Sequence, residues 1–230
     1  MSGFISWNCR GYRTKTGDVK SLLNDFKPAC FALQETYLKH SIAIKIRGYN
    51  CVRKDMDADG PVSGSVCIFT SNSYPSTPLV LHTNLQAVVI QVHVKTLVTV
   101  CCVYLPPRDI ISQEELNSWV DQLPEPFIML GDFNGHSILW GNEDTNSRDQ
   151  QIEQLISDHC LCLMNSDEKT YFHAPTRTFH ALDLAICSPA LLPLLTFTVG
   201  SDLYNSDHFP IFIAHADSVR MAHRPSIYIF

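Results

Sequence analysis

The chain has 230 residues, of which 45% are hydrophobic and 17% charged, a mixture typical of a globular domain that can bury a large core. No stretch approaches the roughly 20 apolar residues of a membrane span, and we expect neither a membrane association nor a secretion signal. The net charge of −6 argues against a simple basic nucleic-acid-binding module. Basic side chains nevertheless gather in residues 1–54, where they are either solvated surface groups or contacts for a phosphate backbone.

The first part of the chain predicts a β-α-β unit. Residues 4–8 and 29–35 are apolar runs typical of strands. Between them, apolar residues recur at the spacing of one helix face over residues 17–27, at Val19, Leu22, Leu23 and Phe26. Pro28 then ends the helix.

The middle of the chain is predicted to be rich in β-structure. Strands are expected at 49–54 and 64–71, on either side of a polar loop at 55–63. A hairpin follows, with strands at 87–94 and 98–104.

The remainder alternates helices with short strands. We expect helices at 112–122, capped by Ser112 with Glu115, and at 148–159, with a buried strand at 127–131 between them. Short strands are predicted at 160–164, 170–173, 181–187, 195–199 and 208–214. This order predicts one α/β domain over residues 1–216, built from two mixed sheets packed face to face with helices outside, and a tail or the start of a linker at 217–230.

Polar groups stand at the ends of four apolar runs. Asn8 and Glu35 follow the first two strands, Asp132 and Asn134 follow the strand at 127–131, and the pair Asp207-His208 precedes the last strand. Alternation along an extended chain predicts that Asp132 and Asn134 point to the same side. One such ending is commonly a turn or a solvated cap, but four together suggest a polar floor where a cation and a phosphate meet.

These residue types are suited to metal-assisted phosphodiester hydrolysis. A hard cation such as Mg²⁺ needs only one or two protein oxygen ligands, which Glu35 and Asn8 can supply. An encounter between Asp183 and His208 would orient the imidazole and favour its protonated form. Asp132, with Asn134, would then position the attacking water.

A set of short motifs resembles the endonuclease/exonuclease/phosphatase superfamily, which includes apurinic endonucleases, DNase I and inositol-phosphate phosphatases. The motifs occur in the family's order and span roughly residues 4–214: Trp7-Asn8, Leu33-Gln34-Glu35-Thr36, Val103-Tyr104-Leu105-Pro106, Gly131-Asp132-Phe133-Asn134, Leu182-Asp183 and Ser206-Asp207-His208. The stretches around Trp7-Asn8 and from Gly131 to Gly141 most resemble the endonuclease domain of non-LTR (LINE-type) retrotransposons of the jockey and I-element branch.

The resemblance implies a four-layered α/β sandwich of the DNase I type and a Mg²⁺-dependent endonuclease, with Mn²⁺ as a possible substitute. Its partners would be double-stranded DNA and a reverse transcriptase domain of the same polyprotein, which extends the 3′-hydroxyl that a nick leaves. The implied domain is monomeric when isolated, intracellular, and nuclear when it acts. Nine cysteines without a C-x-x-C pair fit an intracellular protein without a zinc site.

The same resemblance assigns roles to individual residues. Metal binding falls to Glu35, Asn8 and Asp207; catalysis falls to His208, Asp132, Asn134, Asp183 and Tyr104. Candidate contacts to DNA or phosphate are Asn165, Arg10, Arg13, Arg177 and His180. One departure is His180, because relatives often carry a serine at that position.

Two other functions stay open from the sequence. One is a cellular apurinic endonuclease, which flips a damaged site out of the helix, or a phosphatase of the same fold. The other is an inactive nucleic-acid-binding module, disfavoured because every expected acid, amide and imidazole is present. For a nuclease with this acidic balance we expect weak DNA binding with a shallow salt dependence.

Overall fold

A computed structural model of the chain describes residues 3–55, 64–142 and 147–216. The predicted tail at 217–230 and nearly all of the predicted loop at 55–63 lie outside the described residues. In the part that is described, no helix is long and apolar enough to cross a membrane.

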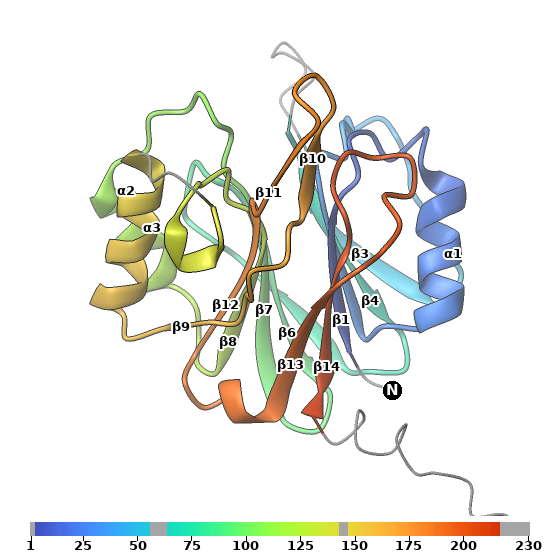
Figure 1. The fold of residues 1–230 in the computed structure, drawn as a ribbon. Coiled ribbons are helices and arrows are strands. Elements are labelled where there is room, and N and C mark those ends of the chain that lie inside the picture. The colour runs from blue at the N-terminus through green and yellow to red at the C-terminus, as the bar shows by residue number, and fades with distance from the viewer. Residues whose placement is uncertain (1–2, 56–63, 143–146, 217–230) are drawn as a thin grey trace, which may run out of the picture.

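Two six-stranded mixed sheets pack face to face (Figure 1). The first sheet consists, in spatial order, of β13 (Leu195–Val199), β14 (Ile211–His215), β1 (Phe4–Asn8), β2 (Cys30–Gln34), β4 (Val66–Ser71) and β3 (Tyr49–Lys54). The second consists of β5 (Ser76–Leu79), β6 (Gln86–His93), β7 (Leu97–Tyr104), β8 (Phe127–Asp132), β12 (Asp183–Cys187) and β9 (Cys162–Leu163). A separate hairpin is formed by β10 (Tyr171–His173) and β11 (Thr178–His180).

Helices cover the outer faces of both sheets. Helix α1 (Thr16–Phe26) lies on the first sheet, and α2 (Gln113–Val120) and α3 (Ser147–Asp158) lie on the second (Figure 1). Two single turns of 3₁₀ helix, Ile138–Trp140 and Leu192–Leu194, complete the elements of the described residues. The order helix, sheet, sheet, helix confirms the predicted four-layered sandwich.

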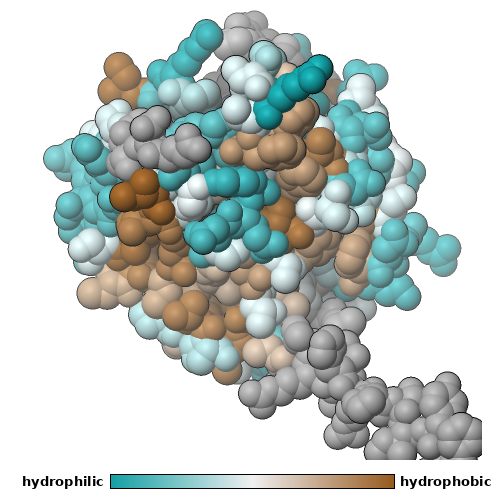
Figure 2. Space-filling view, in the orientation of Figure 1, coloured by the Kyte–Doolittle hydropathy of each residue, from teal (hydrophilic) through white to brown (hydrophobic). Residues whose placement is uncertain are grey.

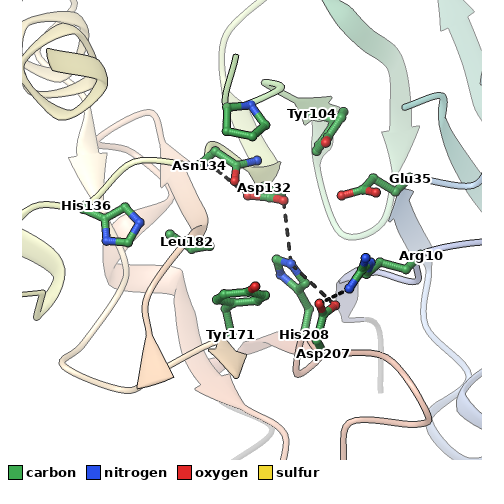
Figure 3. A pocket seen from close by; sticks show the side chains of 11 residues that line it. Arg10, Glu35, Tyr104, Asp132, Asn134, His136, Tyr171, Leu182, Asp207 and His208 are labelled. Atoms are coloured by element: carbon green, nitrogen blue, oxygen red, sulfur yellow. Dashed lines mark hydrogen bonds and ion pairs between the residues drawn. The ribbon is translucent and has the colours of Figure 1, made fainter. Parts of the chain in front are cut away.

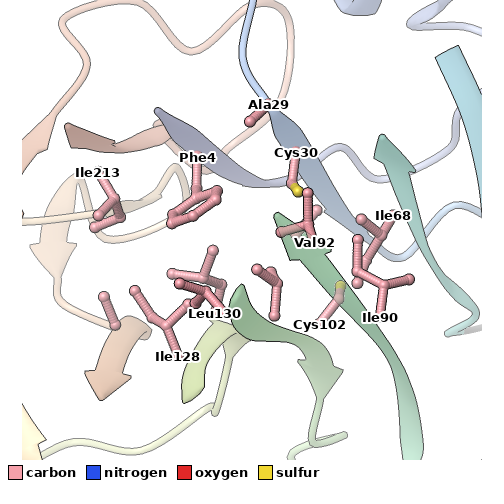
Figure 4. Close-up of a cluster of buried hydrophobic side chains, with 14 of the residues drawn as sticks. Phe4, Ala29, Cys30, Ile68, Ile90, Val92, Cys102, Ile128, Leu130 and Ile213 are labelled. Carbon is pink, nitrogen blue, oxygen red and sulfur yellow. The ribbon is translucent and has the colours of Figure 1, made fainter. Parts of the chain in front are cut away.

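The strands at the centre of each sheet are buried on both faces. Along β1, Phe4 enters the core between the sheets, whereas Ile5 and Trp7 pack under α1. Along β7, Cys102 faces the first sheet and Cys101 packs under α2 and α3. Figure 4 shows the layer between the sheets. Burial on both faces explains why these strands read as continuous apolar runs rather than alternating ones.

Each sheet contains one pair of parallel strands at its centre. These pairs are β1 with β2 and β7 with β8, and all other pairings in the two sheets are antiparallel. Antiparallel neighbours β14 and β12 begin where β1 and β8 end, as the pairing of Asp183 with Asp132 shows. The carboxyl ends of the two parallel pairs and the beginnings of β14 and β12 therefore meet at one edge of the molecule, at the top of Figure 1.

The predicted elements are confirmed with small shifts at their ends, and two strands were missed. The Ser112 side chain accepts a hydrogen bond from the Glu115 backbone N–H at 3.1 Å, as the predicted cap requires. Strand β5 was missed because it is a short edge strand that contains a proline, and β11 because its sequence is polar. The last strand was predicted from 208 but begins at Ile211, since Pro210 has no N–H to donate.

Candidate active site

The amide of Asn8 joins acidic groups of the two sheets. Asn8 is the buried last residue of β1, and its Nδ2 donates to Oε1 of Glu35 and to Oδ2 of Asp132, each at 2.9 Å. Its Oδ1 accepts a hydrogen bond from the backbone N–H of Arg10 at 3.2 Å. The side chain is thereby held with its nitrogen between two carboxylates.

Glu35 follows β2 in a left-handed backbone conformation. The predicted strand at 29–35 is one residue too long, because β2 ends at Gln34 and Glu35 has a φ of 48°. This turn directs the carboxylate into the pocket (Figure 3). The hydroxyl of Tyr37 donates to its Oε2. Glu35 is therefore an accessible carboxylate on a fixed backbone.

His208 forms the predicted pair with Asp183. Nδ1 of His208 lies 2.8 Å from Oδ2 of Asp183, and the indole of Trp7 donates to the His208 carbonyl at 2.9 Å. The backbone N–H of Asp183 donates to the hydroxyl of Thr170 at 3.0 Å, which fixes the acid in turn.

The surroundings of His208 favour its protonated form. Burial alone lowers the pKa of His208, but the charge and hydrogen bond of Asp183, followed by the charges of Asp132 and Asp207, outweigh burial and raise the pKa to about 9. Nε2 faces the pocket, 3.9 Å from Oδ2 of Asp132 and 4.0 Å from Oδ1 of Asp207. This shift favours the imidazolium form, in which Nε2 carries a proton on the side that faces the pocket.

Asp132 and Asn134 reach the pocket, though not by the predicted alternation. Strand β8 ends at Asp132, and Asn134 has a left-handed φ of 50°, so the chain is not extended there. Instead, the backbone N–H of Asn134 donates to Oδ1 of Asp132 at 3.0 Å in a local turn. Burial, partly offset by His208, raises the pKa of Asp132 to about 7, which gives this carboxyl group the range of a general base.

These groups surround a pocket of about 320 Å³ (Figure 3). Its walls are Arg10, Glu35, Tyr104, Pro107, Asp132, Asn134, His136, Tyr171, Leu182, Asp207 and His208. Arg10 forms an ion pair with Asp207, so the expected metal ligand Asp207 is bound to a cationic side chain. Burial and the charges of Glu35 and Asp132 raise the pKa of Tyr104, whose hydroxyl therefore stays a hydrogen-bond donor.

Several residues assigned to DNA or phosphate contacts are not brought to this pocket. Arg13 and Arg177 are exposed and absent from its walls. Asn165 bonds the backbone of β12 through both ends of its amide, donating to Asp183 O at 2.9 Å and accepting from Ala185 N at 2.8 Å. The structure gives Asn165 a structural contact where the sequence suggested a phosphate contact.

His180 and Trp140 have neighbours that the sequence did not specify. The His180 ring packs edge-on against His136, with ring centroids 5.0 Å apart, and its Nε2 lies 2.8 Å from the hydroxyl of Thr178. Trp140 is fully buried and donates to the carbonyl of Gly135 at 3.2 Å, so it supports the loop after β8.

Sequence reasoning assigned no role to three aromatic residues that contact the predicted groups. The ring of Tyr171 lies 4.7 Å from that of His208, Tyr37 bonds Glu35, and Trp7 bonds the backbone of His208. Trp7 and Tyr37 lie one or two residues from predicted site residues, and this proximity in sequence could have identified them. Tyr171 had no such signal, because the hairpin that carries it approaches His208 only in the folded chain.

The donor set fits a hard divalent cation. Among the described residues, no three His, Cys, Asp or Glu side chains converge as a ready-made metal cage. Mg²⁺ does not need one, since it retains waters and takes one or two protein oxygens together with substrate phosphate. An accessible Glu35 carboxylate beside the Asn8 amide and the negative charges of Asp132 and Asp207 meets that requirement.

Comparisons with solved structures define the class of fold. The endonuclease domain of TRAS1, a telomere-specific non-LTR retrotransposon, superposes with a TM-score of 0.78 at 22% identity, over 92% of this chain and 96% of that one. The AP endonuclease LMAP from Leishmania major superposes with a TM-score of 0.71 at 14% identity, over 92% of this chain and 86% of that one. The chain therefore has the DNase I-like nuclease fold.

Sequence comparisons identify the family. The family model described as endonuclease-reverse transcriptase matches residues 98–212, and the chain belongs to this family of nuclease hydrolases. It is 27% identical over 97% of its length to the RNA-directed DNA polymerase from mobile element jockey of Drosophila melanogaster. The corresponding protein of transposon BS, also from Drosophila melanogaster, is 24% identical over 97% of the chain. The chain spans about a quarter of the length of these relatives.

Proposed function

We propose that this chain is a Mg²⁺-dependent endonuclease that nicks double-stranded DNA and leaves a 3′-hydroxyl. A reverse transcriptase domain of the same polyprotein then extends that 3′-hydroxyl. The domain acts in the nucleus, where the target DNA lies. One copy of the domain is enough to make a nick. The observation that carries the proposal is the bridge from Glu35 through Asn8 to Asp132, with Nε2 of His208 3.9 Å from the Asp132 carboxylate. The retrotransposon relatives support the choice of substrate and partner.

Glu35 would hold the cation. Asn8, predicted as a second metal ligand, instead orients the Glu35 carboxylate through its Nδ2, because its oxygen accepts from the backbone N–H of Arg10. When bound, Mg²⁺, or Mn²⁺ in its place, would neutralise charge on the scissile phosphate. Tyr104 and Tyr37 lie around the same carboxylate and keep it oriented toward the pocket. The salt bridge between Arg10 and Asp207 forms the neighbouring wall of the pocket.

The remaining steps fall to Asp132 and His208. Asp132, fixed by Asn8 and Asn134, accepts a proton from the attacking water. The water oxygen bonds to phosphorus, the bond from phosphorus to O3′ breaks, and O3′ takes up a proton from solvent to give the 3′-hydroxyl and a 5′-phosphate. Protonated His208, oriented by Asp183, contacts a phosphate oxygen and stabilises the charge that develops on it.

A nicking assay on supercoiled plasmid tests the proposal. The wild type, Glu35→Ala and His208→Ala are compared with and without Mg²⁺, and His93→Ala, an exposed histidine on the hairpin of β6 and β7, serves as the matched control. We expect metal-dependent nicking by the wild type and the control only. Nicked ends that a polymerase extends without prior phosphatase treatment would establish the 3′-hydroxyl.

A duplex that carries one abasic site distinguishes the proposed nickase from an apurinic repair endonuclease. Cleavage confined to that duplex would replace the proposal with a repair endonuclease. Absence of cleavage on either substrate by a folded wild type would refute it.

A further inference from the structure

The loop between β7 and α2 presents an isoleucine to solvent beside the candidate active site. In this Pro106–Ile111 loop, Pro107, Arg108, Asp109 and Ile110 are exposed, and the Ile110 side chain is 101% exposed. Figure 1 shows the loop at the upper left, above α2, and Figure 2 shows apolar surface over it. A fully exposed isoleucine gains nothing for the fold, because folding removes none of its apolar surface from water.

The backbone of this loop is held in place from below. Arg148 on α3 donates to the carbonyls of Pro106 at 3.4 Å and Asp109 at 2.6 Å, and Gln151 donates to that of Ile111 at 2.6 Å. Arg148 is itself buried. A loop fixed at three carbonyls presents its outward side chains in one arrangement and loses little conformational entropy when a ligand contacts them.

The loop also forms the boundary of the active-site pocket. Pro107 lines that pocket, and Ile110 lines an adjoining groove of about 630 Å³ that shares Pro107, Asn134 and His136 with it. A second groove, of about 520 Å³, lies on the other side of the loop and contains Tyr104. Ile110 therefore stands on a ridge between two grooves that both open toward the candidate catalytic groups.

The ridge carries one exposed cation beside one exposed acid, Asp109, and Glu115 lines the second groove. Arg108 is exposed and lines both grooves. Arg148 lies close enough to Asp109 for their opposite charges to interact. Burial lowers the pKa of Arg148, and the charge of Asp109 raises it by less. An apolar side chain next to an arginine is a combination with which proteins separate stacked base pairs while contacting the adjacent phosphates.

We propose that the Pro106–Ile111 loop is a second DNA contact, in which Ile110 acts as a wedge that unstacks a base step beside the scissile phosphate and Arg108 contacts the backbone. This inference rests on the proposed endonuclease function and adds how the duplex is deformed for cutting. Unstacking widens the backbone at one step and so brings the adjoining phosphate closer to the catalytic groups. Sequence preference then follows from how easily a step unstacks, and pyrimidine–purine steps are the easiest.

The test compares a paired duplex with a duplex already weakened at one step. After the main cut site of the wild type is mapped, two oligonucleotide duplexes are made, one fully paired and one with a single mismatch at the adjoining step. We expect Ile110→Ala to nick the paired duplex about tenfold more slowly and the mismatched duplex at nearly the wild-type rate. Ile110→Leu, which keeps the bulk, should retain activity on both.

A spectroscopic reading checks the mechanism directly. The fluorescence of a 2-aminopurine at the same step should increase when the wild type binds the duplex in the presence of Ca²⁺ in place of Mg²⁺. This increase should be absent when Ile110→Ala binds. The matched control is Val80→Ala, because Val80 is 82% exposed but lines none of these grooves.

The outcomes separate the wedge from the function on which it rests. Equal slowing of Ile110→Ala on both duplexes, or rates equal to those of the control, would overturn the wedge while the nicking activity stands. A wild type that nicks no duplex in Mg²⁺ would overturn the endonuclease function and the wedge together.

Discussion

The two sheets deliver the candidate site through matching topology but provide acids in different environments. Each has one central parallel pair whose carboxyl ends carry polar groups: Asn8 and Glu35 in the first sheet, Tyr104 and Asp132 in the second. Glu35 follows a left-handed turn into the open pocket, whereas Asp132 is 1% exposed. The same architecture thus produces one acid suited to hold a cation and one whose raised pKa suits it to accept a proton.

Replacement of the two acids should reveal their different tasks. We expect Asp132→Asn and Glu35→Ala each to lower the nicking rate by about a thousandfold, since both lose a group that acts on the reacting atoms. Higher Mg²⁺ should restore part of the activity of Glu35→Ala and none of that of Asp132→Asn. Magnesium titrations of the nicking rate measure this, and an identical metal response in both variants would contradict the division.

The pair of His208 and Asp183 joins the two sheets and predicts a pH dependence. If protonated His208 is needed, nicking should decline as the pH rises through about 9. Asp183→Asn removes the largest influence that raises this pKa, so the decline should move to lower pH and the rate at pH 8 should fall by about a hundredfold. An unchanged pH profile in the variant would argue against the role of His208.

The raised pKa of His208 also makes the stability of the fold depend on pH. A histidine whose pKa is raised on folding stabilises the folded state fully below its unfolded value of about 6.5, and the contribution is lost as the pH rises through about 9. Urea unfolding of wild type and His208→Gln at pH 6 and pH 10 should therefore differ more at pH 6.

Two glycines, one at each sheet, lie where an added Cβ atom would clash with a neighbouring backbone. A Cβ at Gly131 would lie 1.9 Å from the backbone oxygen of Val103, between the parallel strands of the second sheet. A Cβ at Gly3 would lie 2.7 Å from the oxygen of Ile213, at the start of the first sheet. Gly131→Ala should lower the free energy of unfolding by about 3 kcal/mol and Gly3→Ala by about 1 kcal/mol, measured by urea denaturation. The reverse ranking would contradict the packing described.

The smallest effect is expected at Asn165, at the edge of the second sheet. Asn165→Ala removes two hydrogen bonds to β12 and should cost about 1–2 kcal/mol of stability, with the KM for DNA unchanged. A raised KM with unchanged stability would instead support the phosphate contact that the sequence suggested.

Much of this molecule follows from local sequence. The apolar runs at 4–8 and 127–131 predict buried strands, and the apolar spacing in residues 17–27 predicts α1, because periodicity and burial are properties of neighbouring residues. The motifs around Glu35, Asp132 and His208 predict polar groups at strand ends, and these groups lie at or near the ends of β2, β8 and β14. The roles assigned to these residues stay predictions until the variants above are measured.

Other features depend on contacts between distant segments and only the tertiary structure decided them. Tyr171 reaches His208 through a hairpin whose approach no local pattern encodes, and Asn165 bonds the neighbouring strand through an amide that the sequence equally suits to a phosphate. The raised pKa of Asp132 needs burial and charges from both sheets. The sequence therefore determined which chemical groups stand at the strand ends, whereas packing of the two sheets decided which of them meet and in what protonation state.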